Sequence, residues 1–412
     1  QMNIIGVGNA KSEGINRGII VDIDKTVQAI QRAVRQAEEK AGIQIRSVSV
    51  GVPANLLEVE NCQGMIAVNS ESKEITDEDV RNVASAALVR STPPERQIIA
   101  SLPQEFTVDG FEGIKGPRGM IGVRLEMFGV VYTGPKTILH NIRKCVEKSG
   151  LIVNELVITP LALTESILSD GEKDFGTIVI DIGGGQTTTS VMHDKQLKFT
   201  HVNQEGGEFV TKDISTVLNT SFNNAEALKI NYGDAYPERT SASEEFPVDV
   251  IGKSEPVKID ERYLAEIIEA RMEQIFNKSK DVLDEIDAFD LPGGIILTGG
   301  AASLPGVVDL AQEVFETNVK LYVPNHMGLR NPVFTNVISI VDYSANLSEV
   351  YQLAKSAITG ERTTQQQPVA IQQEISYEQY EAPEETYEEP EEEKKSESIP
   401  NRVKDFFSNI FE

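Results

Sequence analysis

Apolar positions in the first 53 residues switch between strand spacing and helical spacing. Residues 2–8 (MNIIGVG) have the composition of a strand, and residues 45–52 (IRSVSVGV) alternate as a strand does. Between them, apolar residues recur every three or four positions, which predicts a helix with Asp24 as its N-cap and Gly42 at its C-terminal end. Strand, helix and strand in this order predict the start of an α/β domain.

Residues 54–133 follow a different pattern. Thr76 and Asp79 have the spacing of a capping box, and the apolar residues after them have helical spacing. Two consecutive prolines at 93–94 are expected to end this helix, and several short strands follow. A helix over 138–150 then resumes the earlier alternation. This pattern predicts a small α+β subdomain inserted into a larger α/β domain.

The stretch FGTIVIDIGGGQTTTSVM, residues 175–192, places a carboxylate and three glycines between two β-branched runs. A P-loop would need a lysine after the glycines, and a dinucleotide fingerprint would need a third glycine at Thr188 and then a helix. The β-branched run instead predicts a strand, and therefore a hairpin with a glycine turn. Amides of Gln186 and Thr187 could hold a terminal phosphate there, and Asp181 could hold Mg²⁺ through water. An ordinary glycine-rich β-turn would have the same sequence.

Three further stretches have the composition of nucleotide-binding elements. Residues 292–307 form a predicted strand that ends at a glycine pair, where a helix is expected to begin. A second glycine pair at 206–207 precedes an amphipathic helix, whose N-terminal amides favour phosphate. Glu226 and Lys229 share one helical face, where the carboxylate could accept from ribose hydroxyls and the lysine stem could cover a base. Together these elements predict a nucleotide site more specifically than any one of them.

Charge and cysteine content restrict the classes of function. The net charge of −26 argues against nucleic acid as a partner, because phosphate backbones bind to basic surfaces. The two cysteines, Cys62 and Cys145, form no disulfide framework and are typical of a reducing compartment. The four histidines show no metal-ligand spacing, and no apolar run approaches the ~20 residues of a membrane-spanning helix.

The C-terminal region changes character twice. Residues 361–398 are rich in glutamate and poor in aliphatic side chains, so we expect a disordered acidic linker. Residues 399–412 (IPNRVKDFFSNIFE) then carry an apolar helical stripe that is too short to span a bilayer but suits its interface. A helix that docks in a protein groove would carry the same stripe. The apolar residues of this predicted membrane anchor are Ile399, Val403, Phe406, Phe407, Ile410 and Phe411.

The attraction of this helix to lipid is expected to be hydrophobic rather than electrostatic. Arg402 and Lys404 are opposed by Asp405, Glu412 and the terminal carboxylate. Half-burying six apolar side chains contributes on the order of several kcal/mol, which makes a marginal single anchor. Stable attachment would therefore need many anchors acting together, as in a polymer.

These stretches together resemble the FtsA family of bacterial cell-division proteins, within the superfold of actin, Hsp70 and sugar kinases. The resemblance covers residues 3–360 and rests on SEGINRGIIVDID (12–24), the glycine hairpin, NQEGGEFVTKDI, AEALKINYG, GGIILTGGAASLPGV and NPVFTNVISI (331–340). It implies an α/β, actin-like fold of two α/β halves around a cleft for ATP and Mg²⁺. The matching residues of the second phosphate loop are Asp181, Gly183, Gly184, Gly185, Gln186 and Thr187. Those of the adenosine side are Gly206, Gly207, Glu226, Lys229, Gly299, Gly300 and Ala301.

The resemblance also implies domain boundaries. The family begins with a hairpin that carries its first phosphate loop, and we expect this sequence to be incomplete at that point. The first domain is expected at 1–53, 134–195 and 335–360, with the inserted subdomain at 54–133. The second domain is expected at 196–334, with a smaller partner-binding subdomain at 226–290. The acidic linker and the membrane anchor follow, as above.

The function that the resemblance implies is that of a membrane adaptor in bacterial cytokinesis. ATP-bound subunits would polymerise, and their C-terminal helices would hold the filament on the cytoplasmic face of the membrane at the septum. The second domain would bind the C-terminal peptide of the tubulin-like FtsZ, with Arg271 and Gln274 as candidate contacts, and later division proteins would be recruited. ATP hydrolysis would be slow at most. The alternatives are an ATP-dependent small-molecule kinase and a pilus-assembly scaffold of the same superfold.

Overall fold

The computed structural model describes residues 3–55, 57–89 and 93–359, which all belong to the first of two compact units of the chain, residues 1–363. The predicted linker and the predicted membrane anchor lie outside these described residues.

The largest sheet comes from the second half of the described chain. Its strands are β9 (Thr177–Ile182), β10 (Thr187–His193), β11 (Gln196–Asn203), β14 (Ile295–Thr298) and β15 (Val319–Leu321). They are ordered β11-β10-β9-β14-β15, with antiparallel pairing through β9 to β11 and parallel pairing through β9, β14 and β15. β-Branched residues fill β9, β10 and β14, as is usual for strands that are buried on both faces.

Alternate side chains of β9 enter two different cores. Ile178, Ile180 and Ile182 pack with helices α6 (Gly207–Val217), α8 (Glu261–Asp284) and α9 (Val307–Phe315). Val179 points to the other face, in a smaller cluster with residues from α4 (Thr159–Ile167). Because its side chains alternate in this way, β9 is packed against helices on both faces of the sheet. The turn that joins β9 to β10 is therefore held in place at the end of these strands.

A second α/β layer comes mostly from the first half of the described chain. Its strands β3 (Ser47–Val52) and β8 (Ile152–Ile158) are parallel, and a short hairpin of β1 (Ile15–Asn16) and β2 (Ile19–Ile20) precedes the first helix. The helices of this layer are α1 (Ile23–Ala41), α3 (Lys136–Lys148) and α10 (Thr335–Asn346). Helix α3 packs on β8 and α1, and α10 packs on β3 and α4.

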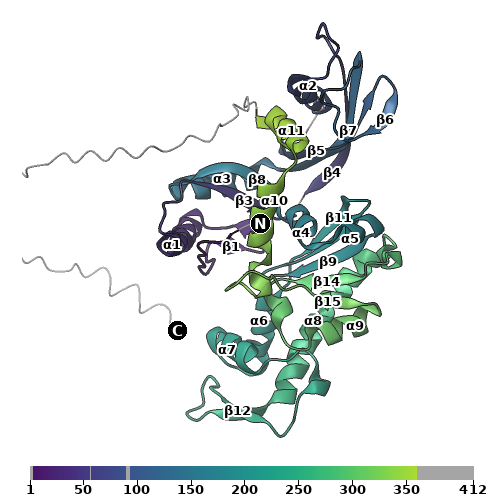
Figure 1. The fold of residues 1–412 in the computed structure, drawn as a ribbon. Helices are drawn as coiled ribbons and strands as arrows, with labels where there is room; N and C mark the ends of the chain where they lie inside the picture. The colour runs from purple at the N-terminus through teal and green to yellow at the C-terminus, as the bar shows by residue number, and fades with distance from the viewer. Residues whose placement is uncertain (1–2, 56, 90–92, 360–412) are drawn as a thin grey trace, which may run out of the picture. The chain divides into compact units, whose positions relative to one another are not determined.

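In sequence, an antiparallel sheet of order β4-β7-β5-β6 is inserted between β3 and α3. Its elements are β4 (Glu58–Ala67), α2 (Asp77–Ala87), β5 (Arg96–Val108), β6 (Phe111–Ile114) and β7 (Arg124–Pro135). The predicted capping box is confirmed, because the Thr76 hydroxyl accepts from the Asp79 amide and the Asp79 carboxylate accepts from the Thr76 amide. Helix α11 (Glu349–Thr359) packs beside α2 and joins the same core through Leu353 and Ala354 (Figure 1).

The remaining elements are short or peripheral. They are α5 (Asp170–Phe175), α7 (Phe222–Tyr232), the hairpin of β12 (Glu245–Val248) and β13 (Val257–Asp260), and the 3₁₀ turns η1 (Pro237–Arg239), η2 (Ala288–Asp290), η3 (Gly300–Ser303) and η4 (Pro332–Phe334).

Two local predictions were wrong. Residues 3–8, the described part of the strand predicted over 2–8, form no strand, because a strand needs a neighbouring backbone to pair with. This segment instead lies along α1, where a side chain on Gly8 would overlap Ala33. The N-cap of α1 is Asp22 rather than Asp24, since Asp22 keeps extended backbone angles and its carboxylate accepts from the Lys25 amide at 3.0 Å. The prediction of a left-handed Gly42 at the end of α1 is confirmed.

The core around α8 gives a testable prediction for stability. Phe276 is fully buried, and its ring lies 5.4 Å from that of Phe315. Phe276→Ala should lower the free energy of unfolding by about 3–5 kcal/mol, because it removes a large side chain and leaves a cavity. Phe175→Ala is the matched control, since Phe175 is 70% exposed. Urea unfolding measures both variants, and equal midpoints for the two would contradict this description of the core.

Candidate functional site

The predicted glycine hairpin is confirmed, with β9 and β10 antiparallel and residues 183–186 forming the turn. The Gly183 amide donates to the Gln186 carbonyl at 2.9 Å. The amides of Gly184, Gly185 and Gln186 have no acceptor among the described residues. Thr187 begins β10, where it pairs with neighbouring strands on both sides. The turn therefore presents three backbone donors, which is a suitable arrangement for an anion.

The N-terminus of α6 packs directly on this turn. The Gly207 amide donates to the Gly183 carbonyl at 2.9 Å, and the Glu208 amide donates to the Gly184 carbonyl at 2.8 Å. A side chain on Gly206 would overlap Gly183 and would lie 2.7 Å from the Gly184 carbonyl oxygen. These two helix amides, which the sequence offered as phosphate donors, are thus used to hold the turn.

The two charged residues of α7 also reach this place. Lys229 Nζ donates to the Gly207 carbonyl at 3.1 Å, to the Thr211 hydroxyl at 2.7 Å and to the Glu226 carboxylate at 2.7 Å. Thr211 donates to the same carboxylate. The Glu226 side chain remains 39% exposed, so one side of it is open to a ligand hydroxyl.

The third glycine pair lies on the other side of the hairpin. Gly299 has a φ of +93°, and a side chain there would overlap the Asp181 carboxylate. Gly300 begins η3 and faces Val333, and Ala301 Cβ lies 3.0 Å from the position that a Cβ on Gly207 would take. Most of the thirteen residues that the sequence proposed for nucleotide thus lie in or against the turn and the start of α6. Glu226 is linked to them through Lys229 and Thr211, and Gly300 faces Val333. We call the seven glycines among the thirteen the glycine cluster: Gly183, Gly184, Gly185, Gly206, Gly207, Gly299 and Gly300.

Asp181 is the acidic group of this cluster. Asn336 Nδ2 donates to its Oδ2 at 2.7 Å, whereas Oδ1 is enclosed and has no hydrogen-bond partner. Burial raises the pKa of Asp181, and the Asn336 hydrogen bond opposes this rise. Asp181, Gln186 and Asn336 line one pocket of about 400 Å³. Each has one enclosed oxygen without a hydrogen-bond partner, and those of Asp181 and Gln186 lie against Gly299 and Gly18.

The Asp181 carboxylate is a ligand of the kind that hydrated Mg²⁺ prefers, since Mg²⁺ binds oxygen, commonly through one or two carboxylates and several waters. Within the described ranges, no group of three or more His, Cys, Asp or Glu side chains could hold a metal ion. Any Mg²⁺ at Asp181 would therefore need water or ligand oxygens to complete its coordination. The sequence did not assign Asn336, although it lies in the NPVFTNVISI stretch that carried the resemblance.

Arg271 and Gln274, the candidate contacts for an acidic peptide, lie on α8 and bind one another. Arg271 Nε also binds the Asp213 carboxylate at 2.5 Å, and its NH1 lies 3.5 Å from Glu205. The Arg271 side chain is only 18% exposed. Hydrogen bonding to Asp213 raises the pKa of this guanidinium, which therefore stays protonated. The Asp213 carboxylate already balances its positive charge.

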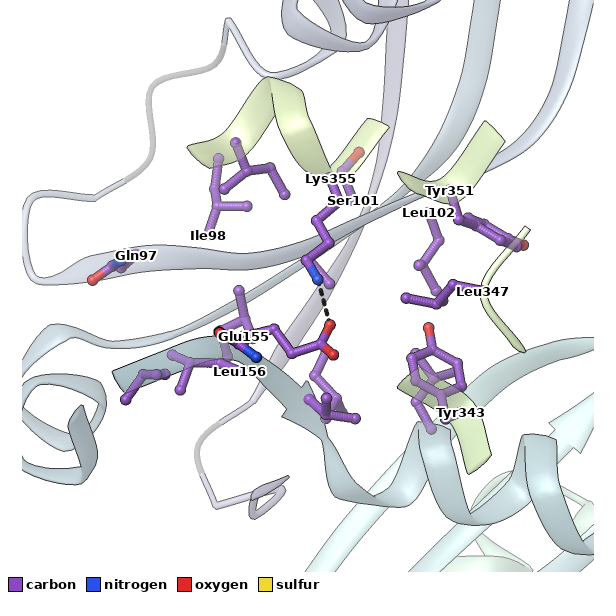
Figure 2. Close-up of a pocket in the computed structure, with 18 of the residues that line it drawn as sticks. Gln97, Ile98, Ser101, Leu102, Glu155, Leu156, Tyr343, Leu347, Tyr351 and Lys355 are labelled. Carbon is purple, nitrogen blue, oxygen red and sulfur yellow. Dashed lines mark hydrogen bonds and ion pairs between the residues drawn. The ribbon is translucent and has the colours of Figure 1, made fainter. Parts of the chain in front are cut away.

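A second pocket, of about 370 Å³, lies between β5 and β8 beneath α11. Figure 2 shows its central ion pair, in which Lys355 Nζ and the Glu155 carboxylate lie 2.5 Å apart. Burial alone would raise the pKa of Glu155, but hydrogen bonds from Lys355 and Ser49 help to lower it. None of the thirteen residues proposed for nucleotide lines this pocket.

The fold of this chain is actin-like, with two α/β parts and an inserted subdomain. A chain of the PilM-PilN type IV pilus biogenesis complex has the same fold with a TM-score of 0.55 and 15% identity, over 82% of this chain and 90% of that chain. Family models then narrow the class. The models described as cell division protein FtsA, the SHS2 domain inserted in FtsA, and the FtsA C-terminal region match residues 178–339, 55–133 and 350–412.

Curated relatives agree with these family models. The cell division protein FtsA of Enterococcus faecalis is 81% identical over 100% of this chain and 94% of the relative. FtsA of Bacillus subtilis is 44% identical over 85% of this chain and 79% of the relative, and FtsA of Escherichia coli is 34% identical over 83% and 84%. The chain belongs to the FtsA family of cell-division proteins. Every helix in the described part of the chain is too short or too polar to cross a membrane.

The packing of α6 on the turn gives a prediction for nucleotide binding. Gly206→Ala should weaken ATP binding by at least tenfold, because the added Cβ separates α6 from the glycine turn, where the Gly183 and Gly184 carbonyls now accept. Gly171→Ala is the matched control, since a Cβ there meets no atom within 4 Å. Equilibrium binding of a fluorescent ATP analogue measures the difference, and equal affinities for the two variants would contradict the prediction.

Asp181 gives a prediction for pH dependence. Its pKa is raised on folding, so the nucleotide-free folded state retains the proton to higher pH than the unfolded chain does. The free energy of unfolding should therefore fall as pH rises from about 3.9, the unfolded pKa, to the folded pKa. Asp181→Asn should remove this fall and stabilise the nucleotide-free protein at neutral pH. The control is Asp290→Asn, at an exposed position. Urea unfolding between pH 4 and pH 8 tests this, and the same pH slope in both variants would refute it.

Proposed function

We propose that this FtsA-family protein binds ATP with Mg²⁺ at the glycine cluster, polymerises, and tethers the FtsZ ring to the cytoplasmic face of the membrane during cytokinesis. The observation that supports nucleotide binding best is the convergence of four distant sequence stretches on one turn with three free amides. A site that bound its ligand only through side chains would not require the glycine cluster. A ligand that is bound by backbone amides, such as a phosphate chain, would require it.

Each part of the cluster has an expected role toward the nucleotide. The amides of Gly184, Gly185 and Gln186 would donate to the terminal phosphates, and Asp181 would hold Mg²⁺ through water. Glu226 would accept from ribose hydroxyls, and the Lys229 stem would lie along the base. Mg²⁺ would neutralise phosphate charge in a site that otherwise carries several carboxylates.

The partner roles follow from family membership and from the C-terminal sequence. We propose that residues 226–290 bind the FtsZ C-terminal peptide. Arg271 would have to exchange Asp213 for a peptide carboxylate to take part, so exposed residues of the same region are better candidates. Later division proteins would bind to the assembled filament. The kinase alternative lacks a nominated catalytic base, and the pilus alternative rests on a likeness that shows the fold alone.

The membrane role is tested by flotation with liposomes. The full chain should float, whereas a chain that ends at Ser398 should not, and ATP should increase flotation through assembly. Moderate salt should have little effect, because the attraction is hydrophobic. Phe406→Glu should abolish flotation, and Asn409→Ser on the polar face is the control. If the truncated chain floats as well as the full chain, the terminal helix docks on protein and is no membrane anchor.

A further inference from the structure

The tip of the first hairpin lies on the glycine turn. Arg17 and Gly18 join β1 to β2, and the position of a Cβ on Gly185 would be 3.5 Å from the Arg17 amide nitrogen. A side chain on Gly18 would overlap the amide oxygen of Gln186. Asn55 Nδ2 donates to the Arg17 carbonyl at 3.3 Å, which ties this tip to the chain beyond β3. The hairpin therefore brings Arg17 to the turn from more than 160 residues away in sequence.

Arg17 has an unusual backbone and a weakly held side chain. Its φ is +49°, a conformation that costs energy for any residue other than glycine and that occurs more often at functional sites than elsewhere. The residue is exposed, and its Cζ lies 5.2 Å from the centre of the Phe209 ring in the first turn of α6. At an exposed position such a cation–π contact is a weak interaction. No carboxylate pairs with Arg17 among the described residues.

The other basic side chains around the cluster already have acidic partners. Lys229 binds Glu226, Arg271 binds Asp213, and Lys278 binds Glu205. Acidic groups face the turn as well, since Glu208 lies 3.6 Å from the position of a Cβ on Gly184. A phosphate at the free amides would therefore meet carboxylates and basic groups that are already neutralised. Among the basic groups named here, Arg17 alone carries a charge that no carboxylate balances.

We propose that Arg17 is a further phosphate-binding residue, whose guanidinium leaves the Phe209 ring and binds the phosphate furthest from adenosine. This inference rests on the proposed nucleotide binding. Guanidinium and phosphate form short, charge-assisted and often bidentate hydrogen bonds, which are stronger than an exposed cation–π contact. Phe209 serves as the resting position of the side chain. Arg17 would then favour ATP over ADP, because only ATP places a third phosphate at the turn.

Nucleotide affinity tests this assignment. Mg·ATP and Mg·ADP are titrated by calorimetry into the full chain, Arg17→Ala, Arg17→Lys and the control Arg32→Ala, which removes an exposed arginine from α1. Arg17→Ala should weaken ATP binding about tenfold and leave ADP binding nearly unchanged. Arg17→Lys should recover part of the loss, and Arg32→Ala should match the unaltered chain. Phe209→Leu should keep the preference for ATP.

Folding effects are separated by a second variant. Arg17→Gly removes the same charge but suits a positive φ, so it should reproduce the loss of ATP affinity without strain. If Arg17→Ala weakens ATP and ADP equally and Phe209→Leu does the same, Arg17 only supports the turn, and the proposal is wrong. If Arg17→Ala matches Arg32→Ala, it is also wrong. If the unaltered chain binds neither nucleotide, the proposed function itself fails, which is a different result from failure of Arg17 alone.

Discussion

Two hydrogen bonds between backbones, from Gly207 to Gly183 and from Glu208 to Gly184, organise this molecule around its candidate site. They form only because no side chain separates the turn from the start of α6. The same contact fixes α6 against the large sheet and leaves the next three amides of the turn free. Close backbone approach therefore builds the fold and the proposed phosphate site at once.

Charged side chains around this contact are mostly committed to one another. The Lys229 ammonium ties α7 to the first turn of α6, and the Arg271 guanidinium ties α8 to α6 through Asp213. Asp181 is held differently, since its hydrogen-bond donor is the Asn336 amide and its other oxygen is enclosed without a partner. A buried, unsatisfied carboxylate is costly to retain, and the proposed binding of hydrated Mg²⁺ would account for that cost.

Local sequence signals predicted much of this arrangement. The hairpin, the capping box at Thr76 and the actin-like fold follow from spacing, glycines and resemblance, and the structure and relatives confirm them. Contacts between residues that are far apart in sequence could not be predicted from local signals. Nothing local indicated that Asn336 would bind Asp181, or that Arg271 would be neutralised by a carboxylate from another helix. Residues 3–8 likewise have a strand composition, but no described strand pairs with them.

The central claim is that the free amides of the glycine turn receive phosphate. Amide hydrogen exchange at Gly184, Gly185 and Gln186, measured with and without saturating Mg·ATP, tests this claim most directly. Exchange at these three amides should slow strongly when nucleotide is bound, while amides in the distant sheet of β4 to β7 stay unchanged. Unchanged exchange at the turn, under conditions where the protein demonstrably holds ATP, would show that the nucleotide binds elsewhere.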